Sequence, residues 1–157
     1  MEYKNRHRLK DKKIEKYVEQ MQDKLGDSPF HLGDQVDVAD TENGKVVIAN
    51  DKVQATFFDD EVFPTIKGFL DMGATKRYVT VDMGAVKFVY NGADVMAPGI
   101  VDADESIEEG QLVWVRDVEH KKPLAVGRAM TDGRTMIGSD SGKVIKSLHH
   151  VGDGKYT

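Results

Sequence analysis

The sequence predicts an α+β protein, with a small α+β domain over residues 1–75 followed by a small β-barrel over residues 76–157. Three observations predict it. Apolar residues recur at helical spacing from about residue 9 to 25, and three strand-like segments follow them. After Gly73 the pattern changes to short strands separated by Gly-rich turns, which indicates a barrel rather than an open sheet. A chain of 157 residues, 39% of them apolar, is long enough to bury a real core.

In the first domain, the apolar repeat predicts a helix over residues 9–25 that Gly26 can close. Residues 27–33 are expected to form a loop. Three segments with alternating or β-branched residues then predict a meander over 35–40, 45–50 and 52–58. Asn43-Gly44 supplies the left-handed residues that a tight hairpin turn needs. Pro64 suits the first turn of a second helix over 65–72, with Gly73 at its end.

In the second domain, strands alternate with turns and one short helix. The helix is expected over residues 84–90, where Asn91-Gly92 ends it. Turns are expected at 119–122 and at Asp132-Gly133, with Pro98-Gly99 breaking a strand. The strands are expected over 77–83, 93–96, 111–118, 121–130 and 144–151. We place the boundary between the two domains near residues 74–76.

The net charge of −5 hides a strong asymmetry along the chain. Residues 1–16 hold seven Lys or Arg against three acids, a net of +4. Residues 17–76 carry a net of −7, and residues 77–157 carry only −2. A basic leader can contact phosphates and release counterions, but it can equally be the solvated face of a helix. The overall negative charge therefore does not exclude an RNA ligand for the second domain, and it does argue against tight, purely electrostatic binding.

Composition excludes several classes of protein. The chain has no cysteine, so no disulfide framework and no thiolate metal site are expected. The longest run without a charged residue is Val95–Val101, which is too short to cross a membrane. Met1 leads into a basic stretch with no apolar segment behind it, so no signal peptide is expected. We expect a cytoplasmic protein with no membrane partner.

No motif in the sequence requires catalysis. The segment Gly138–Lys143 lacks one residue of a phosphate loop, and Val144 stands where Ser or Thr would hold magnesium. The acidic segment 102–109 fails as a calcium loop, because Ile107 occupies the position of the turn glycine. His149 and His150 are adjacent on a predicted strand and point to opposite faces, so they cannot share one metal. We expect no enzyme activity, no catalytic residue, no cofactor and no metal.

One segment suggests contact with a nucleic acid. Over Lys87–Ile100 a short helix and a strand are followed at once by Ala97-Pro98-Gly99. A glycine at the end of a strand lets another backbone approach closely, as a sugar-phosphate chain must, and Lys87 is near enough in sequence to meet a phosphate. On spacing alone, a barrel corner that needs Pro-Gly to turn explains the segment at least as well.

The same segment carries a family resemblance. Residues 81–99, Val-Asp-Met-Gly-Ala-Val-Lys-Phe-Val-Tyr-Asn-Gly-Ala-Asp-Val-Met-Ala-Pro-Gly, resemble the core of the PUA domain, named for pseudouridine synthases and archaeosine transglycosylases. Later motifs fit in order: Gly110 before the strand 112–115, Pro-Leu-Ala-Val-Gly at 123–127, Gly-Lys-Val at 142–144, and the closing Leu-His-His-Val-Gly-Asp at 148–153. The resemblance implies a PUA-type β-barrel for residues 76–157.

The first half narrows the resemblance. Val62-Phe-Pro-Thr-Ile66 is similar to the Tyr-Pro-Thr-Leu element of malignant T-cell amplified sequence proteins, which also pair a small α+β domain with a PUA domain. The chain resembles their archaeal counterparts. This resemblance implies a non-catalytic, ribosome-associated RNA-binding protein of translation, whose partners are tRNA or the rRNA of the small ribosomal subunit. A ribosomal or translation-factor protein is a further partner that it implies.

By the same resemblance, the RNA-facing groove lies between the short helix and the strand that follows, with the last strand beside it. That places the candidate RNA-binding residues at Gly84, Ala85, Lys87, Met96, Ala97, Pro98, Gly99, Ile100 and His149. Met83 stands where the family usually has a charged residue. Phe88 and Val89 are interpreted as core residues, and Trp114 as a packing residue rather than an outward contact.

Two other functions remain open at this point. The chain can be a protein–protein adaptor, in which the acidic first domain docks a basic partner and the PUA domain is a scaffold. It can also be an accessory subunit of an RNA-modifying enzyme, although the remaining 75 residues do not accommodate a catalytic domain.

Overall fold

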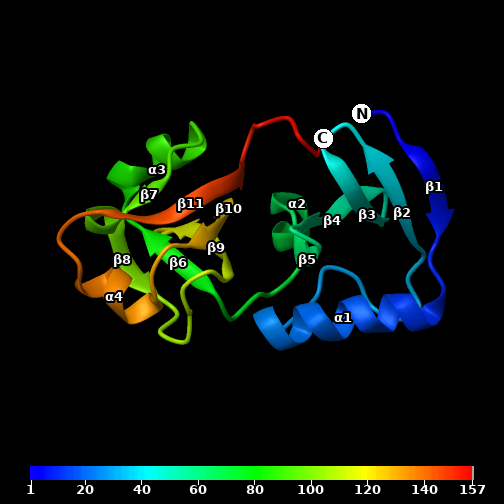
Figure 1. Ribbon diagram of the computed structural model, residues 1–157, viewed down its shortest axis with the longest axis horizontal. Helices are drawn as coiled ribbons and strands as arrows, with labels where there is room; N and C mark the ends of the chain where they lie inside the picture. The colour runs from blue at the N-terminus through cyan, green and yellow to red at the C-terminus, as the bar shows by residue number, and fades with distance from the viewer. Residues whose placement is uncertain (157) are drawn as a thin grey trace. The chain divides into compact units, whose positions relative to one another are not determined.

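The structure, a computed structural model, describes residues 1–156 and divides into two compact units. The first unit holds Met1–Thr75 together with the segment that starts at Gly154, and the second holds Lys76–Asp153. Figure 1 follows both units along the chain from blue to red. Among the described residues, no helix is long and apolar enough to span a membrane.

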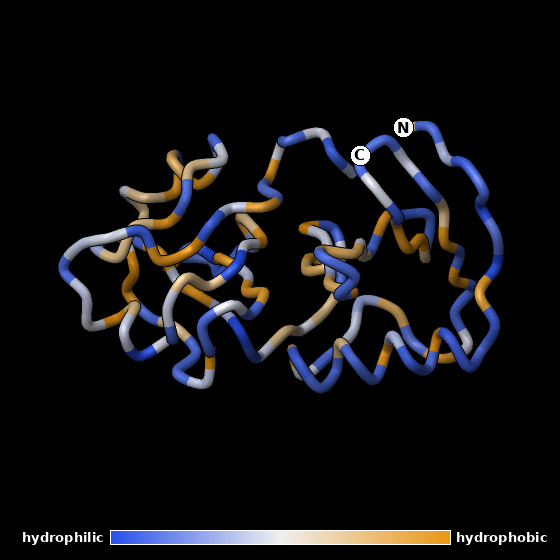
Figure 2. Tube along the Cα trace, in the orientation of Figure 1, coloured by the Kyte–Doolittle hydropathy of each residue, from blue (hydrophilic) through white to orange (hydrophobic). Residues whose placement is uncertain are grey.

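The first unit is a five-stranded antiparallel sheet with a helix on one face. The strands follow each other in the order β1 (Lys4–Arg8), β2 (Val36–Thr41), β3 (Gly44–Ala49), β4 (Lys52–Phe58) and β5 (Glu61–Pro64). Helix α1 (Asp11–Leu25) buries Ile14, Val18 and Met21 against this sheet, and it ends at Gly26 in the left-handed conformation. In Figure 2, apolar colour recurs at intervals along α1, whereas β1 is hydrophilic. The predicted helix, its closing glycine and the predicted meander are confirmed.

Two strands of this sheet were not predicted. Strand β1 lies in the basic leader. All five of its residues are exposed, so no alternation of apolar and polar residues marks it as a strand. Leu9, the expected start of the helix, instead donates its backbone N–H to Val36 O and continues the sheet pairing. Strand β5 ends at Pro64, which pairs with Ala55 at the edge of the sheet, where a missing N–H is tolerated.

Helix α2 (Ile66–Leu70) is shorter than predicted. Pro64 is not in its first turn, because Thr65 is the N-cap and accepts a hydrogen bond from Gly68 N. Gly73 is not its C-cap either, since the helix ends at Leu70 and Asp71 is the C-cap. The Asp71 carboxylate accepts hydrogen bonds from Lys52 and from the buried Gln54, which fixes the end of α2 to β4.

The last residues of the chain return to the first unit. Tyr156 is buried in an apolar cluster with Ala39, Val46, Ile48 and Val53. Asn43 Nδ2 donates a hydrogen bond to Lys155 O over 3.1 Å. The face of the sheet opposite to α1 is therefore covered in part by residues more than 100 positions away in sequence.

The second unit is a nearly closed β-barrel, as predicted. Its six strands are β6 (Tyr78–Val81), β7 (Val95–Met96), β8 (Ile100–Ala103), β9 (Leu112–Asp117), β10 (Pro123–Ala129) and β11 (Lys143–His150), in the spatial order β7-β11-β10-β9-β6-β8. The edge strands β7 and β8 are joined by a single 3-10 turn, η1 (Ala97–Gly99), so the chain itself links the two edges. Strands β6 and β9 are parallel, and the other pairs are antiparallel.

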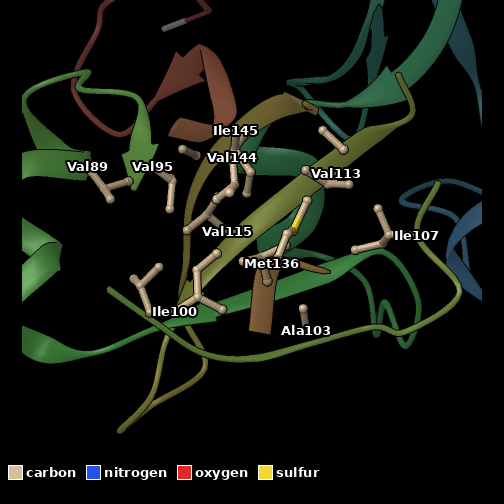
Figure 3. Close-up of a cluster of buried hydrophobic side chains, with 14 of the residues drawn as sticks. Val89, Val95, Ile100, Ala103, Ile107, Val113, Val115, Met136, Val144 and Ile145 are labelled. Carbon is tan, nitrogen blue, oxygen red and sulfur yellow. The ribbon is translucent and has the colours of Figure 1, made fainter. Parts of the chain in front are cut away.

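The barrel encloses one apolar core. Figure 3 shows side chains from α3 (Met83–Tyr90), β7, β8, β9, β11 and the short helix α4 (Gly133–Gly138) pointing toward one another inside it. Val89 is the residue of α3 that is buried in this core, and Ala97 of η1 is buried there too. The core thus fixes both the helix and the turn that frame the candidate site.

Strand β8 and helix α4 were missed. Asp132-Gly133, predicted as a turn, begins α4, and the Asp132 carboxylate caps it by accepting from Thr135 N over 2.9 Å. Gly133 lies so close to Asp104 O that a side chain would collide with it, which packs α4 against the segment after β8. Six residues are too few to show a helical period.

Candidate nucleic-acid interface

A groove of about 640 Å³ opens on the second unit between α3 and the β7–η1 segment. One wall comes from α3, the opposite wall from β7 and η1, and Lys143 at the start of β11 completes the rim. The residues that line the groove are Asp82, Gly84, Ala85, Phe88, Val89, Ala93, Asp94, Val95, Met96, Pro98, Gly99 and Lys143.

The first turn of α3 is fixed against η1. The Asp82 carboxylate caps the helix by accepting from Ala85 N over 2.9 Å, and Asp82 N donates to Gly99 O over 2.9 Å. A Cβ on Gly99 would lie 3.1 Å from the Ala85 Cβ. Glycine at position 99 therefore lets the turn approach the helix closely, and this close approach sets the width of one end of the groove.

The opposite wall is fixed by pairing with the last strand. Lys143 lies opposite Met96, Ile145 lies opposite Val95, and Ala97 N donates to Gly142 O over 2.9 Å. Because successive side chains of a strand alternate, burial of Val95 in the core turns Met96 outward. The register of β7 on β11 thus brings Lys143 beside Met96.

One ion pair dominates the electrostatics of the groove. Asp94 Oδ2 lies 3.1 Å from Lys143 Nζ, and Asp94 Oδ1 accepts from Ser147 N over 2.8 Å. The Ser147 N–H and, after it, the Lys143 ammonium hold the pKa of the Asp94 carboxyl below its usual range. Lys143 is therefore oriented by a carboxylate, and an anionic ligand must compete with Asp94 for it.

The groove presents apolar side chains to solvent. Phe88 is 57% exposed and Met96 is 49% exposed. Lys87 Nζ lies 5.3 Å from the centroid of the Phe88 ring. The interpretation of Phe88 as a core residue is wrong, because α3 turns Val89, the next residue, into the barrel and leaves Phe88 on the groove side.

The structure brings together five of the nine predicted site residues in this groove: Gly84, Ala85, Met96, Pro98 and Gly99. Lys87 is exposed on α3 but does not line the groove. Ala97 and Ile100 are buried in the barrel core behind it.

His149 lies apart from these residues. It is 5% exposed, and its Nδ1 is 2.7 Å from Asp153 Oδ2. The adjacent His150 directs its Nδ1 to Val151 O. Trp114 is also buried, as predicted, and its Nε1–H donates to Lys76 O over 2.9 Å.

Sequence reasoning missed the charged and aromatic parts of the groove, namely Asp82, Phe88, Asp94 and Lys143. Asp82 carries a local signal, since an aspartate directly before a short helix is a frequent N-cap. Lys143 lies in the Gly-Lys-Val motif, but its place beside Met96 depends on a strand pairing across 47 residues, which no local pattern shows. In residues 1–156, no group of three or more His, Cys, Asp or Glu side chains is placed to hold a metal ion.

Family models match both halves of the chain. The PUA domain model matches residues 77–151, which include every residue of the groove. A model of a domain of unknown function, DUF1947, matches residues 5–71.

Individual proteins are also similar to this chain over part of their length. An uncharacterised protein of Methanocaldococcus jannaschii is 49% identical over 118 residues, which cover 75% of this chain and 73% of that protein. Translation machinery-associated protein 20 of Saccharomyces cerevisiae is 31% identical over 60% of this chain and 55% of its own length. A malignant T-cell-amplified sequence 1 homolog of Dictyostelium discoideum is 27% identical over 71% of this chain and 64% of its own length.

Solved structures share both units. A hypothetical protein of Pyrococcus horikoshii has a TM-score of 0.83 at 33% identity, covering 95% of this chain and 96% of that one. A conserved PUA domain protein of Thermoplasma acidophilum has a TM-score of 0.84 at 27% identity and covers 96% of both chains. The groove between α3 and η1 therefore lies in a PUA domain, and the chain belongs to the family of PUA-domain proteins that includes translation machinery-associated protein 20 and the malignant T-cell-amplified sequence 1 homologues.

Proposed function

We propose that the protein is a non-catalytic RNA-binding protein of translation, which contacts tRNA or the rRNA of the small ribosomal subunit through the groove between α3 and η1. The name of translation machinery-associated protein 20, a relative in two yeasts, supports a role in translation, and the PUA match to residues 77–151 supports RNA as the ligand. A ribosomal or translation-factor protein is the second partner that this role implies.

The observation that carries the proposal is the combination of exposed apolar side chains and nearby cations in one groove. Phe88 comes from α3 and Met96 from β7, so an unstacked base that enters between the two walls meets both. Bases stack on aromatic side chains whatever their sequence, and single-stranded segments are the part of an RNA that can offer them. Lys143 lies at the rim and Lys87 beside the Phe88 ring, where each can meet a phosphate.

The charge of the second unit limits the mode of binding. Asp82 and Asp94 line the same groove as Lys143, so the groove is not a uniformly positive surface. An RNA held here is recognised by shape and by few phosphate contacts. Each neutralised phosphate of a single strand adds about 0.7 to the slope of log K against log salt. Because few phosphates are contacted here, the affinity depends less on salt than it would in a uniformly basic groove.

Binding of the full chain to purified tRNA and to isolated small subunits, measured by fluorescence anisotropy at several salt concentrations, tests the proposal. Replacing both groove-side lysines, with Lys87→Glu and Lys143→Glu together, should weaken binding at least tenfold and lower the salt slope by about 1.4. Lys121→Glu with Lys122→Glu is the matched control, since both lysines are exposed in the same unit outside the groove and the change in net charge is the same.

Equal affinities for the double variant, the control and the parent protein would refute the proposal. The circular dichroism spectrum and the urea midpoint of each variant establish that it is folded. Crosslinking in cell extract, followed by sequencing of the attached RNA, identifies the ligand. Recovery of tRNA ends or of small-subunit rRNA is the expected result, and recovery of neither contradicts the proposed role.

A further inference from the structure

A second groove lies on the first unit, along the exposed side of α1. Its volume is about 320 Å³. Helix α1 contributes Glu15, Val18, Glu19 and Gln22, and the loop after the helix contributes His31 and Leu32. Nothing in the RNA-binding proposal uses this surface.

The loop holds an apolar side chain out of the core. Leu32 is 59% exposed, although Phe30, two residues earlier, is fully buried in the apolar cluster under α1. His31 N donates to Asp34 Oδ2 over 2.9 Å, and Asp34 N donates to His31 O over 3.1 Å. These two bonds close the turn on either side of its tip, Leu32-Gly33. Leu32 is therefore presented by an anchored loop and does not need to be ordered when a partner binds.

The loop is also tied down at its start. Asp27 Oδ2 accepts from Gly73 N over 2.8 Å, which joins the loop to the segment after α2. The Gly73 N–H and a second backbone N–H, that of Ser28, overcome partial burial and lower the pKa of the Asp27 carboxyl, so this carboxylate remains charged and bonded at neutral pH. The floor of the groove is Val18, which is nearly fully buried.

The rim of the groove is acidic. Glu15 and Glu19 are exposed, one helical turn apart on the same side of α1. Within residues 1–156 neither carboxylate forms an ion pair. Like charges at this spacing destabilise a helix slightly, and a partner that carries positive charge would remove that penalty. The groove thus combines an apolar floor, a protruding leucine and two unpaired carboxylates.

We infer that this groove docks a lysine- or arginine-rich amphipathic segment of a partner protein. An apolar side chain of the segment would pack between Val18 and Leu32, and its cations would meet Glu15 and Glu19. Charge complementarity selects this occupant. Nucleic acid is disfavoured, because its phosphates would lie against the two glutamates.

The experiment titrates the full chain, labelled with ¹⁵N, with a synthetic 14-residue helical peptide of leucine and lysine. A matched peptide has glutamate in place of every lysine. The lysine peptide should shift the amide signals of α1 and of residues 31–33 and leave the barrel signals unchanged, and the glutamate peptide should not bind. Leu32→Ser should weaken binding of the lysine peptide at least fivefold, and Glu15→Lys with Glu19→Lys at least tenfold.

Two variants of the same unit serve as matched controls. Leu70 is 61% exposed at the end of α2, so Leu70→Ser removes an equally exposed leucine elsewhere. Glu42→Lys reverses one exposed acid in the turn between β2 and β3 and controls for charge reversal away from the groove. Both should bind the lysine peptide within twofold of the parent protein.

The inference is overturned if Leu70→Ser weakens binding as much as Leu32→Ser, or if the glutamate peptide binds equally well. It is also overturned if the shifted signals lie outside α1 and the loop. RNA binding by the Leu32→Ser variant should be unchanged, so failure of this inference and failure of the RNA-binding proposal are separate outcomes.

Discussion

The groove of the second unit and strand β1 of the first unit both present cations, and they differ in how those cations are held. Strand β1 is the more basic in sequence, but Arg6 and Arg8 both bind the carboxylate of Asp37, over 2.8 and 2.6 Å. The groove has one cation in its lining, Lys143, which is paired with Asp94, and Lys87 lies outside the lining beside the Phe88 ring. It also has what β1 lacks, namely exposed apolar side chains between two rigid walls.

The comparison shows that the density of positive charge in a sequence does not reveal which cations are already held by a carboxylate. Salt bridges on a surface contribute little to stability. They nevertheless affect binding, because a phosphate must displace the carboxylate partner of a paired lysine or arginine before it can bind that side chain. A phosphate that approaches β1 competes with one carboxylate for two arginines. A nucleotide that approaches the groove gains stacking in addition to charge.

The largest expected effect comes from distorting the groove at Gly99, where η1 packs against α3. In Gly99→Val, the new Cβ would lie 3.1 Å from the Ala85 Cβ and the γ-methyl groups would push α3 away from η1. We expect a loss of RNA affinity of at least tenfold and a loss of about 1–3 kcal/mol in the free energy of unfolding. Anisotropy and urea unfolding measure the two effects.

Gly138→Val is the control for this change, because a Cβ at position 138 meets no atom within 4 Å. It should keep both affinity and stability close to those of the parent protein. If Gly99→Val remains folded and binds RNA normally, the groove is not the RNA site and β1 becomes the better candidate.

A smaller effect comes from releasing the paired cations in each region separately. Asp94→Asn keeps an acceptor for Ser147 N but frees Lys143, so RNA binding should tighten about two- to fivefold, the range expected for one exposed ion pair. Asp37→Asn frees Arg6 and Arg8 and should change RNA affinity less than twofold. The same binding assay compares both, and the reverse order of the two effects would move the RNA site to the first unit.

The smallest effect is a dependence of stability on pH. Hydrogen bonds from Arg8 and then Arg6 lower the pKa of the Asp37 carboxyl. A carboxyl with a lowered pKa in the folded state stabilises the fold above its unfolded pKa of about 3.9, and this contribution is lost as the pH falls through the folded value.

Because both arginines are about half exposed, the contribution is modest. At pH 7 the parent protein should exceed Asp37→Asn by roughly 0.5–1 kcal/mol in free energy of unfolding. Urea unfolding between pH 2 and 7 should show this difference constant above about pH 5 and shrinking below pH 4. A difference that grows on acidification would contradict the assignment.

Local patterns predicted the elements that have a strong period or a special turn residue. Helix α1 shows a helical repeat over 15 residues and ends at Gly26, and Gly44 turns the hairpin between β2 and β3. Strand β5 was hidden because Pro64 is as typical of a helix start as of an edge strand. Strand β1 was hidden because charged residues on both faces leave no alternation to read.

The candidate site was only partly predictable for a different reason. The family resemblance located Gly84, Met96 and Gly99, because the motif itself carries them. Both Phe88 and Val89 were interpreted as core residues, and only Val89 is buried, since one residue turns a helix by about 100° and only the position of the barrel shows which side chain enters the core. Lys143 joins the groove through the register of β7 on β11, a pairing that no local pattern encodes.

The return of the chain at Tyr156 has a consequence for the order in which the protein can fold during synthesis. The first 75 residues leave the ribosome well before Lys155 and Tyr156, and until then part of the apolar cluster at Ala39, Val46 and Ile48 lacks its cover. The barrel is complete by Asp153 and can fold without waiting for either residue. The unit that is made first is therefore completed last, and a released chain that ends at Asp153 would fold its barrel but leave part of one apolar face of the sheet uncovered.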